Sequence, residues 1–226
     1  RTSIHELKGQ KVAEIVIQTN EENSLTFQTL KELQSILTRY HEDPVVRAVI
    51  LSSENEKFFS NGVDAATIMN APAERLATEM GQIVHFFNYL MGFDKPLLAE
   101  VSGYAMGGGA VITMASDFRF MLEGKSRISF TEVMFGLPLP GVFIDKLQIT
   151  VLPHRLHEVI YGGLYKATEA QAIGLIDEVA DSRAELRRLV LRRAEQLLRV
   201  PSSAVSGTKR SLHRALLERQ EGHMED

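Results

Sequence analysis

Strand-like and helix-like segments alternate along the first 130 residues, and this alternation restricts the fold more than any other feature of the sequence. Residues 11–18 alternate in polarity and are rich in β-branched side chains, which is typical of a strand. Residues 25–40 place apolar side chains at helical spacing, and residues 48–52 form a second strand-like run. Because a helix joins the two strands, we expect them to pair in parallel.

The same rhythm continues along the chain, with helix 73–92, strand 97–101, helix 108–115, strand 118–121 and a short strand over 127–130. After Gly141 the pattern becomes helical, over 143–152, 154–161, 168–173, 184–198 and 206–219. This order predicts an α/β fold rather than separate α and β parts. We expect one structural unit, with a core over 1–141 and a helical C-terminal region over 142–226.

The composition excludes several classes of protein. The chain has 226 residues, 44% hydrophobic residues and a net charge of −4, which argues against disorder and against a nucleic-acid-binding surface. It has no cysteine, so disulfides and thiolate metal sites are excluded. His154 and His157 lack a third ligand nearby, so we expect no metal site.

The sequence also argues against a membrane-spanning helix, because no run reaches the roughly 18 apolar residues that span a bilayer. No signal-peptide pattern is visible, so we expect a bacterial cytoplasm or an organelle matrix. The first residue is Arg1 rather than Met, which leaves an upstream or removed segment open.

Three consecutive glycines, residues 107–109, lie where a strand-like run turns into a helical run. Glycines at such a turn expose backbone N–H groups at the positive end of a helix dipole, where a negative oxygen is stabilised. The alternative is a tight turn with close packing. A lone carboxylate, Glu132, follows in an apolar setting. An anion site beside one carboxylate suggests proton abstraction next to a carbonyl group.

Seven short segments occur in an order and spacing that resemble the crotonase, or enoyl-CoA hydratase/isomerase, superfamily over roughly residues 5–215. The glycine turn and Glu132 lie within two of them. The segments are 23–25, 59–64, 95–99, 103–109, 117–119, 130–133 and 170–177.

The resemblance implies a spiral of ββα units that binds an acyl-CoA thioester as substrate, with no metal or redox cofactor. By motif position, the backbone N–H groups of Val63 and Gly108 form the oxyanion hole. Ser24, Asp64 and Ala66 lie in the segments that meet coenzyme A, and Asp64 is expected to cap the helix after it. Family members usually form trimers, or hexamers built from trimers, so the resemblance implies a homo-oligomer.

The acid–base positions of the family distinguish its reactions. Hydratases carry two glutamates; here the first position is Val111 and the second is Glu132. This pattern resembles the Δ3,Δ2-enoyl-CoA isomerases of fatty-acid β-oxidation, in which one base moves a proton from C2 to C4. We expect burial by Phe130 and Val133 to raise the pKa of Glu132. Pro140 stands where dienoyl isomerases have an aspartate, which argues against that reaction.

Several alternatives stay open from the sequence. The scaffold also supports hydration, decarboxylation and thioester hydrolysis, and hydration would require Glu100, Asp145 or another group to replace the missing carboxylate. A non-catalytic acyl-CoA-binding subunit is a further alternative. The basic residues Lys209, Arg210 and Arg214 are candidates for contact with the phosphates of coenzyme A, against the alternative of a solvated helix face.

Overall fold

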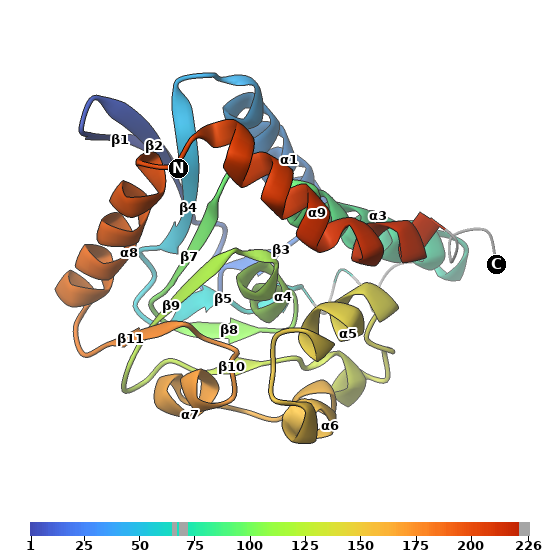
Figure 1. The fold of residues 1–226 in the computed structure, drawn as a ribbon. Helices are drawn as coiled ribbons and strands as arrows, with labels where there is room; N and C mark the ends of the chain where they lie inside the picture. The colour runs from blue at the N-terminus through green and yellow to red at the C-terminus, as the bar shows by residue number, and fades with distance from the viewer. Residues whose placement is uncertain (65–66, 68–71, 222–226) are drawn as a thin grey trace.

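A six-stranded sheet forms the centre of the molecule in the computed structural model, which describes residues 1–64, 67 and 72–221 (Figure 1). The strand order is β1-β2-β4-β7-β9-β11. All neighbours pair in parallel except β1 and β2. The predicted parallel crossover between residues 11 and 52 is confirmed by the pairing of β2 with β4. The strands are β1 (Thr2–Leu7), β2 (Gln10–Ile17), β4 (Val46–Ser53), β7 (Leu97–Val101), β9 (Phe118–Leu122) and β11 (Glu178–Ala180).

The first part of the chain repeats one unit: a strand of the large sheet, then one or two short strands that belong to smaller sheets, then a helix. The short strands are β3 (Ser24–Leu25), β5 (Phe58–Ser60), β6 (Gly62–Val63), β8 (Tyr104–Met106) and β10 (Ile128–Ser129). They form a three-stranded sheet, β10-β8-β5, and a two-stranded sheet, β3-β6. The helices of these turns are α1 (Phe27–Glu42), α3 (Ala73–Gly92) and α4 (Gly108–Ala115). The predicted spiral of ββα units is therefore confirmed.

The C-terminal region is mostly helical, as the sequence indicates, but its elements are shorter and one is a strand. The predicted helix over 143–152 ends at Gln148, and the one over 154–161 is a 3-10 turn followed by a short helix. The strands β11 and β1 were not predicted from the sequence. The elements are η1 (Glu132–Phe135), α5 (Gly141–Gln148), η2 (Pro153–Arg155), α6 (Leu156–Ile160), α7 (Ala167–Ala172), α8 (Arg183–Leu198) and α9 (Ser202–Glu221).

Two hydrophobic cores cover the two faces of the large sheet. Alternation along β7 separates them: Leu97, Ala99 and Val101 point into the larger core, and Leu98 points toward α8 in the smaller one. The larger core also takes up α1, α3, α4 and α5, and α9 lies along α3 and α5 (Figure 1). No helix in the described part of the chain is long and apolar enough to cross a membrane.

Candidate active site

A cavity of about 540 Å³ opens where β3, β6, the N-terminus of α4 and η1 meet. It brings together five of the six residues predicted to form the site: Ser24, Val63, Asp64, Gly108 and Glu132. The sixth, Ala66, lies outside the described residues. These five come from four separate segments of the chain, so the fold unites motifs that are far apart in the sequence.

The backbone N–H of Val63 points away from its partner strand. The N–H of Asp64 donates to the carbonyl of Leu25 at 2.9 Å, in the parallel pair of β6 with β3. Successive N–H groups of a strand point to opposite sides, so the N–H of Val63 faces the other way, toward α4. Gly62 has a φ of +81°, and a Cβ there would lie 2.7 Å from the nitrogen of Gly108. The two chain segments therefore approach as closely as they do only because residue 62 is glycine.

Gly108 is the first residue of α4, and its N–H has no carbonyl partner within the helix. Gly107 adopts a φ of +48° and donates its own N–H to the carbonyl of Ser129 at 2.9 Å. A Cβ on Gly108 would lie 3.3 Å from the nitrogen of Val63, so the two amide groups are neighbours. A pair of adjacent N–H groups at a helix N-terminus has the chemistry of an oxyanion hole.

The carboxylate of Glu132 lies on the far side of the same turn. A Cβ on Gly107 would lie 3.6 Å from its Oε1, while its Oε2 is buried and has no hydrogen-bond partner among the described residues. Burial raises the pKa of Glu132 to about 7, against a smaller lowering effect of its own backbone N–H. This direction is the one expected from the sequence. A carboxylate with a pKa near 7 is suited to both taking and returning a proton at neutral pH.

The rest of the cavity wall is apolar. Helix α3 contributes Met80, Ile83, Val84 and Phe87, and α5 contributes Phe143. These side chains of α3 line the cavity and also belong to or pack against the larger core. The end of η1 adds Phe135, and the loop after it adds Leu137 and Pro138. These residues were missed from the sequence because no periodic pattern predicts where a short turn and a loop lie.

Of the residues expected near coenzyme A, Ser24 and Asp64 line the cavity. Ser24 is buried in β3. The carboxylate of Asp64 accepts the backbone N–H of Thr67 at 3.0 Å and its hydroxyl at 2.9 Å. The first of these contacts is the one expected of a helix N-cap.

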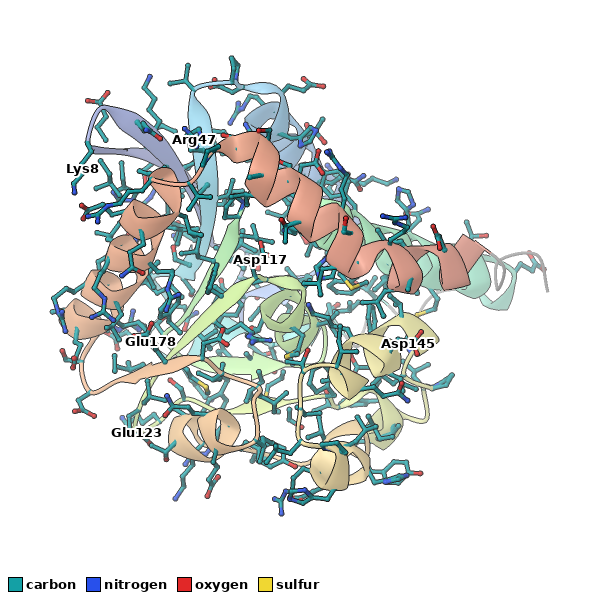
Figure 2. All side chains as sticks on the ribbon, in the orientation of Figure 1. Lys8, Arg47, Asp117, Glu123, Asp145 and Glu178 are labelled. Atoms are coloured by element: carbon teal, nitrogen blue, oxygen red, sulfur yellow. The ribbon has the colours of Figure 1, made fainter. Side chains whose placement is uncertain are left out.

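Other candidates from the sequence lie away from the cavity. Glu100 faces α8 on the opposite side of the sheet, 3.2 Å from Nε of Arg187. Burial raises its pKa to about 7 even so. Asp145 lies half-buried on α5 and is not among the cavity-lining residues (Figure 2). Neither side chain therefore takes the place of the first hydratase glutamate, whose position is Val111 here.

The predicted phosphate contact by Lys209 is wrong, because its amine is buried and donates to Asp117 at 2.7 Å. Arg210 pairs with Asp94 at 2.9 Å. In residues 1–64, 67 and 72–221, no group of three or more His, Asp or Glu side chains could hold a metal ion.

Comparison with known proteins gives consistent results. The family model for enoyl-CoA hydratase/isomerase matches residues 8–225. Carnitinyl-CoA dehydratase of Escherichia coli (strain K12) is 28% identical over 211 residues, covering 92% of this chain and 78% of the relative. The enoyl-CoA hydratase structure from Bacillus anthracis has 26% identity and a TM-score of 0.84, covering 100% of this chain and 91% of that one.

The structure of human mitochondrial Δ3-Δ2-enoyl-CoA isomerase has a TM-score of 0.92 at 22% identity, covering 99% of this chain and 87% of that one. At this identity the similarity shows the fold alone. The human structure and the present one share the crotonase arrangement of mixed sheets with a helical C-terminal region.

Proposed function

The chain belongs to the enoyl-CoA hydratase/isomerase family, and we propose that within it the protein shifts the double bond of a 3-enoyl-CoA to give the trans-2-enoyl-CoA. Members of this family typically act on a CoA thioester without a cofactor. The observation that carries the proposal is one buried carboxylate, Glu132, which lies beside two adjacent backbone amides and whose Oε2 has no hydrogen-bond partner in the part of the chain that the structure describes.

In the proposed reaction, the thioester oxygen accepts hydrogen bonds from the N–H groups of Val63 and Gly108. Glu132 removes a proton from C2, which is acidified by both the carbonyl and the alkene. The electron pair of the C2–H bond forms a C1–C2 double bond while the carbonyl π pair moves onto the thioester oxygen, so the intermediate is a dienolate with its negative charge on that oxygen. Glu132 then returns the proton to C4: the C3–C4 π pair takes the proton, the C1–C2 π pair becomes the C2–C3 double bond, and the carbonyl reforms. Each oxyanion donor contributes about 3–4 kcal/mol to such a transition state.

A water addition reaction is the main competitor, since the relatives compared include a dehydratase and a hydratase. Hydration needs a group that positions and activates water in addition to the proton donor. The position of the first hydratase glutamate holds Val111, which is buried and apolar. Glu100 and Asp145 lie off the cavity wall, and the other two carboxylates on it accept hydrogen bonds elsewhere, Glu22 from the amide of Asn61 and Asp64 from Thr67. The position of Glu132 alone beside the glycine turn supports isomerisation over hydration.

The experiment is turnover of a 3-enoyl-CoA by the wild-type protein and by Glu132→Gln, with a 2-enoyl-CoA in water as the paired assay. We expect isomerisation by the wild type, its loss in the variant and no hydration by either protein. Hydration by the wild type would contradict the single-carboxylate mechanism. Binding of acyl-CoA without any turnover would instead support a non-catalytic binding subunit.

We also propose that the protein self-associates, as the family resemblance implies. Large apolar side chains are exposed around η1, α6 and the segment after it: Met134 is 70% exposed, Tyr161 68% and Leu164 57%. Apolar surface of this kind is typical of an interface. Light scattering in solution should give the mass of a trimer or hexamer, and a monomer at micromolar concentration would contradict this part of the proposal.

A further inference from the structure

A second cavity, of about 400 Å³, lies at the amino ends of β4 and β7. The end of α1, the end of α8 and the start of α9 also contribute to its wall, so we call it the α9 cavity. No described residue lines both this cavity and the catalytic one. Pockets that hold small ligands have volumes of roughly 300–1,000 Å³, so the α9 cavity has room for a ligand of its own.

The wall of the α9 cavity is partly apolar and partly polar. Two hydroxyl residues, Ser202 and Ser206, lie on the first turns of α9. A wall of this kind fits a small molecule that has an apolar body and a polar end. The apolar side chains are Pro44, Val46, Pro96, Leu197, Val200 and Val205.

Arg47 of β4 is the first of two cations in this wall. Figure 2 shows it beside the turn between α8 and α9, where its Nη2 donates to the carbonyl of Val200 at 2.9 Å. Its Nη1 donates to the side-chain oxygen of Gln10 at 2.8 Å. Both acceptors are uncharged, and Nε has no hydrogen-bond partner among the described residues. The guanidinium has five N–H donors and is only partly buried, so it retains donors and charge for a ligand.

Lys95, directly before β7, is the second cation. Its amine donates to the carbonyls of Tyr40 and Asp43, each at 2.6 Å, which leaves one of its three N–H groups. Burial lowers the pKa of Lys95; the charge of Asp43 opposes this effect and the charge of Arg47 adds to it. The two cations therefore lie close enough to repel each other, and an anion beside them would stabilise both.

The carboxylates of the wall leave these cations without a counter-ion. Asp94 pairs with Arg210 at 2.9 Å, and Glu42 is exposed to solvent. In the part of the chain that the structure describes, no carboxylate lies within ion-pair distance of Arg47 or Lys95. The α9 cavity thus has the volume, the apolar surface and the uncompensated positive charge that a small organic anion requires.

We propose that the α9 cavity binds a small carboxylic acid with a short apolar chain, whose carboxylate pairs with Arg47 and whose chain packs on the apolar wall. This site is separate from the catalytic cavity and does not depend on the proposed isomerase activity. The carboxylate would supply the missing counter-ion and form charge-assisted hydrogen bonds. The positive end of α9, a helix of 20 residues, adds to the attraction.

The test titrates the ¹⁵N-labelled wild-type protein with hexanoate at low salt and about pH 7, where this acid is ionised. The amide signals of Val205 and Ser206 report on the α9 cavity, and those of Gly107 and Gly108 report on the catalytic one. We expect saturable shifts at Val205 and Ser206, with an affinity about tenfold or more above that of hexan-1-ol, which has the same chain and no charge. About 0.5 M salt should weaken the binding of hexanoate and leave that of hexan-1-ol unchanged.

Two serine variants form a matched pair. Ser202→Asp places a negative charge in the cavity wall, at a helix N-terminus where such a charge does not destabilise the fold, and should weaken hexanoate binding about tenfold or more. Ser203 is exposed on the same turn and is not among the lining residues, so Ser203→Asp should change the affinity less than about threefold. Arg47→Gln should weaken hexanoate binding as Ser202→Asp does, and thermal unfolding shows whether each variant is folded.

Equal weakening by Ser202→Asp and Ser203→Asp would overturn the inference, because the effect would then come from the total charge of the protein. Hexan-1-ol that binds as tightly as hexanoate would overturn it as well. Shifts confined to Gly107 and Gly108 would place the acid in the catalytic cavity instead. Inorganic phosphate that binds as tightly as hexanoate would show that the apolar wall contributes nothing, which also contradicts the proposal.

Discussion

The charged form of Glu132 should reduce the stability of the fold, because its carboxylate is buried and no described residue offers a hydrogen-bond partner to Oε2. Burial raises the pKa of this group from 4.5 to about 7. Since one pKa unit equals 1.36 kcal/mol, the difference corresponds to about 3 kcal/mol between the charged and the neutral form. Glutamine has nearly the same shape and no charge, so Glu132→Gln removes this cost.

The sign of the effect follows from proton binding. Between about pH 4.5 and pH 7 the folded protein retains a proton on Glu132 that the unfolded chain has lost, so stability falls as the pH rises through this window. Above pH 7 the full cost is present. We therefore expect Glu132→Gln to be about 3 kcal/mol more stable than the wild type near pH 8, which is roughly 6–12 °C in melting temperature for a chain of this size. Near pH 4.5 the two proteins should be equally stable.

Urea unfolding at a fixed protein concentration, at about pH 4.5 and pH 8, measures this difference directly. Glu100→Gln is the matched control, because burial also raises the pKa of Glu100 to about 7 but on the opposite face of the sheet. It should show a gain of the same sign at pH 8 and keep the activity, whereas Glu132→Gln gains stability and loses activity. A stability difference for Glu132→Gln that does not change with pH would refute the reasoning.

Further predictions concern the pH profile, the oxyanion turn and two buried polar groups. The value of kcat/KM should rise with pH through about 7 as Glu132 loses its proton, and a profile flat between pH 5 and pH 8 would contradict the base assignment. Gly62→Ala places a Cβ 2.6 Å from a backbone carbonyl and should lower kcat by about 100-fold or more, while Gly81→Ala, with open space around it, should leave kcat unchanged in the same assay. Asn23→Ala removes amide hydrogen bonds of 2.8 Å to Ser53 and 3.1 Å to a strand carbonyl, so denaturant unfolding should show a loss of about 2–3 kcal/mol. Asp177→Ala leaves the buried Arg119 guanidinium unpaired and should cost about 3–5 kcal/mol in the same measurement; a loss under 1 kcal/mol would show that water reaches that ion pair.

The regular part of the fold was predictable because its signals are local. The helices at 73–92 and 108–115 and the strand at 97–101 have the predicted bounds, since each carries its own periodicity. The strand β1 was missed because it is a half-exposed edge strand without apolar alternation. The strand β11 has only three residues. It pairs with β9, which is far away in the sequence, and no local pattern predicts such a pairing.

The candidate site was predictable where a short sequence motif identifies a residue. The motifs around Val63, Gly108 and Glu132 identified residues that the fold brings to one cavity. The pairing of Lys146 with His213 was not predictable, because the two residues are 67 positions apart and lie on helices whose contact is set by tertiary packing. The misassignment of Lys209 has the same origin: its helical pattern indicates a basic face, and only the packing of α9 shows that this residue points inward to Asp117.

The two oxyanion donors that we propose, the N–H groups of Val63 and Gly108, belong to the main chain, and this affects which substitutions the protein tolerates. No substitution at residue 63 other than proline can delete its N–H, so a change of this side chain alters the cavity wall and leaves the N–H donor in place. Activity should instead be sensitive to substitution one residue upstream, at Gly62, because a side chain there would push the β6 segment away from the N-terminus of α4. In a saturation scan, the strongest loss of activity should therefore appear at Gly62, although the proposed hydrogen-bond donors are the N–H groups of Val63 and Gly108.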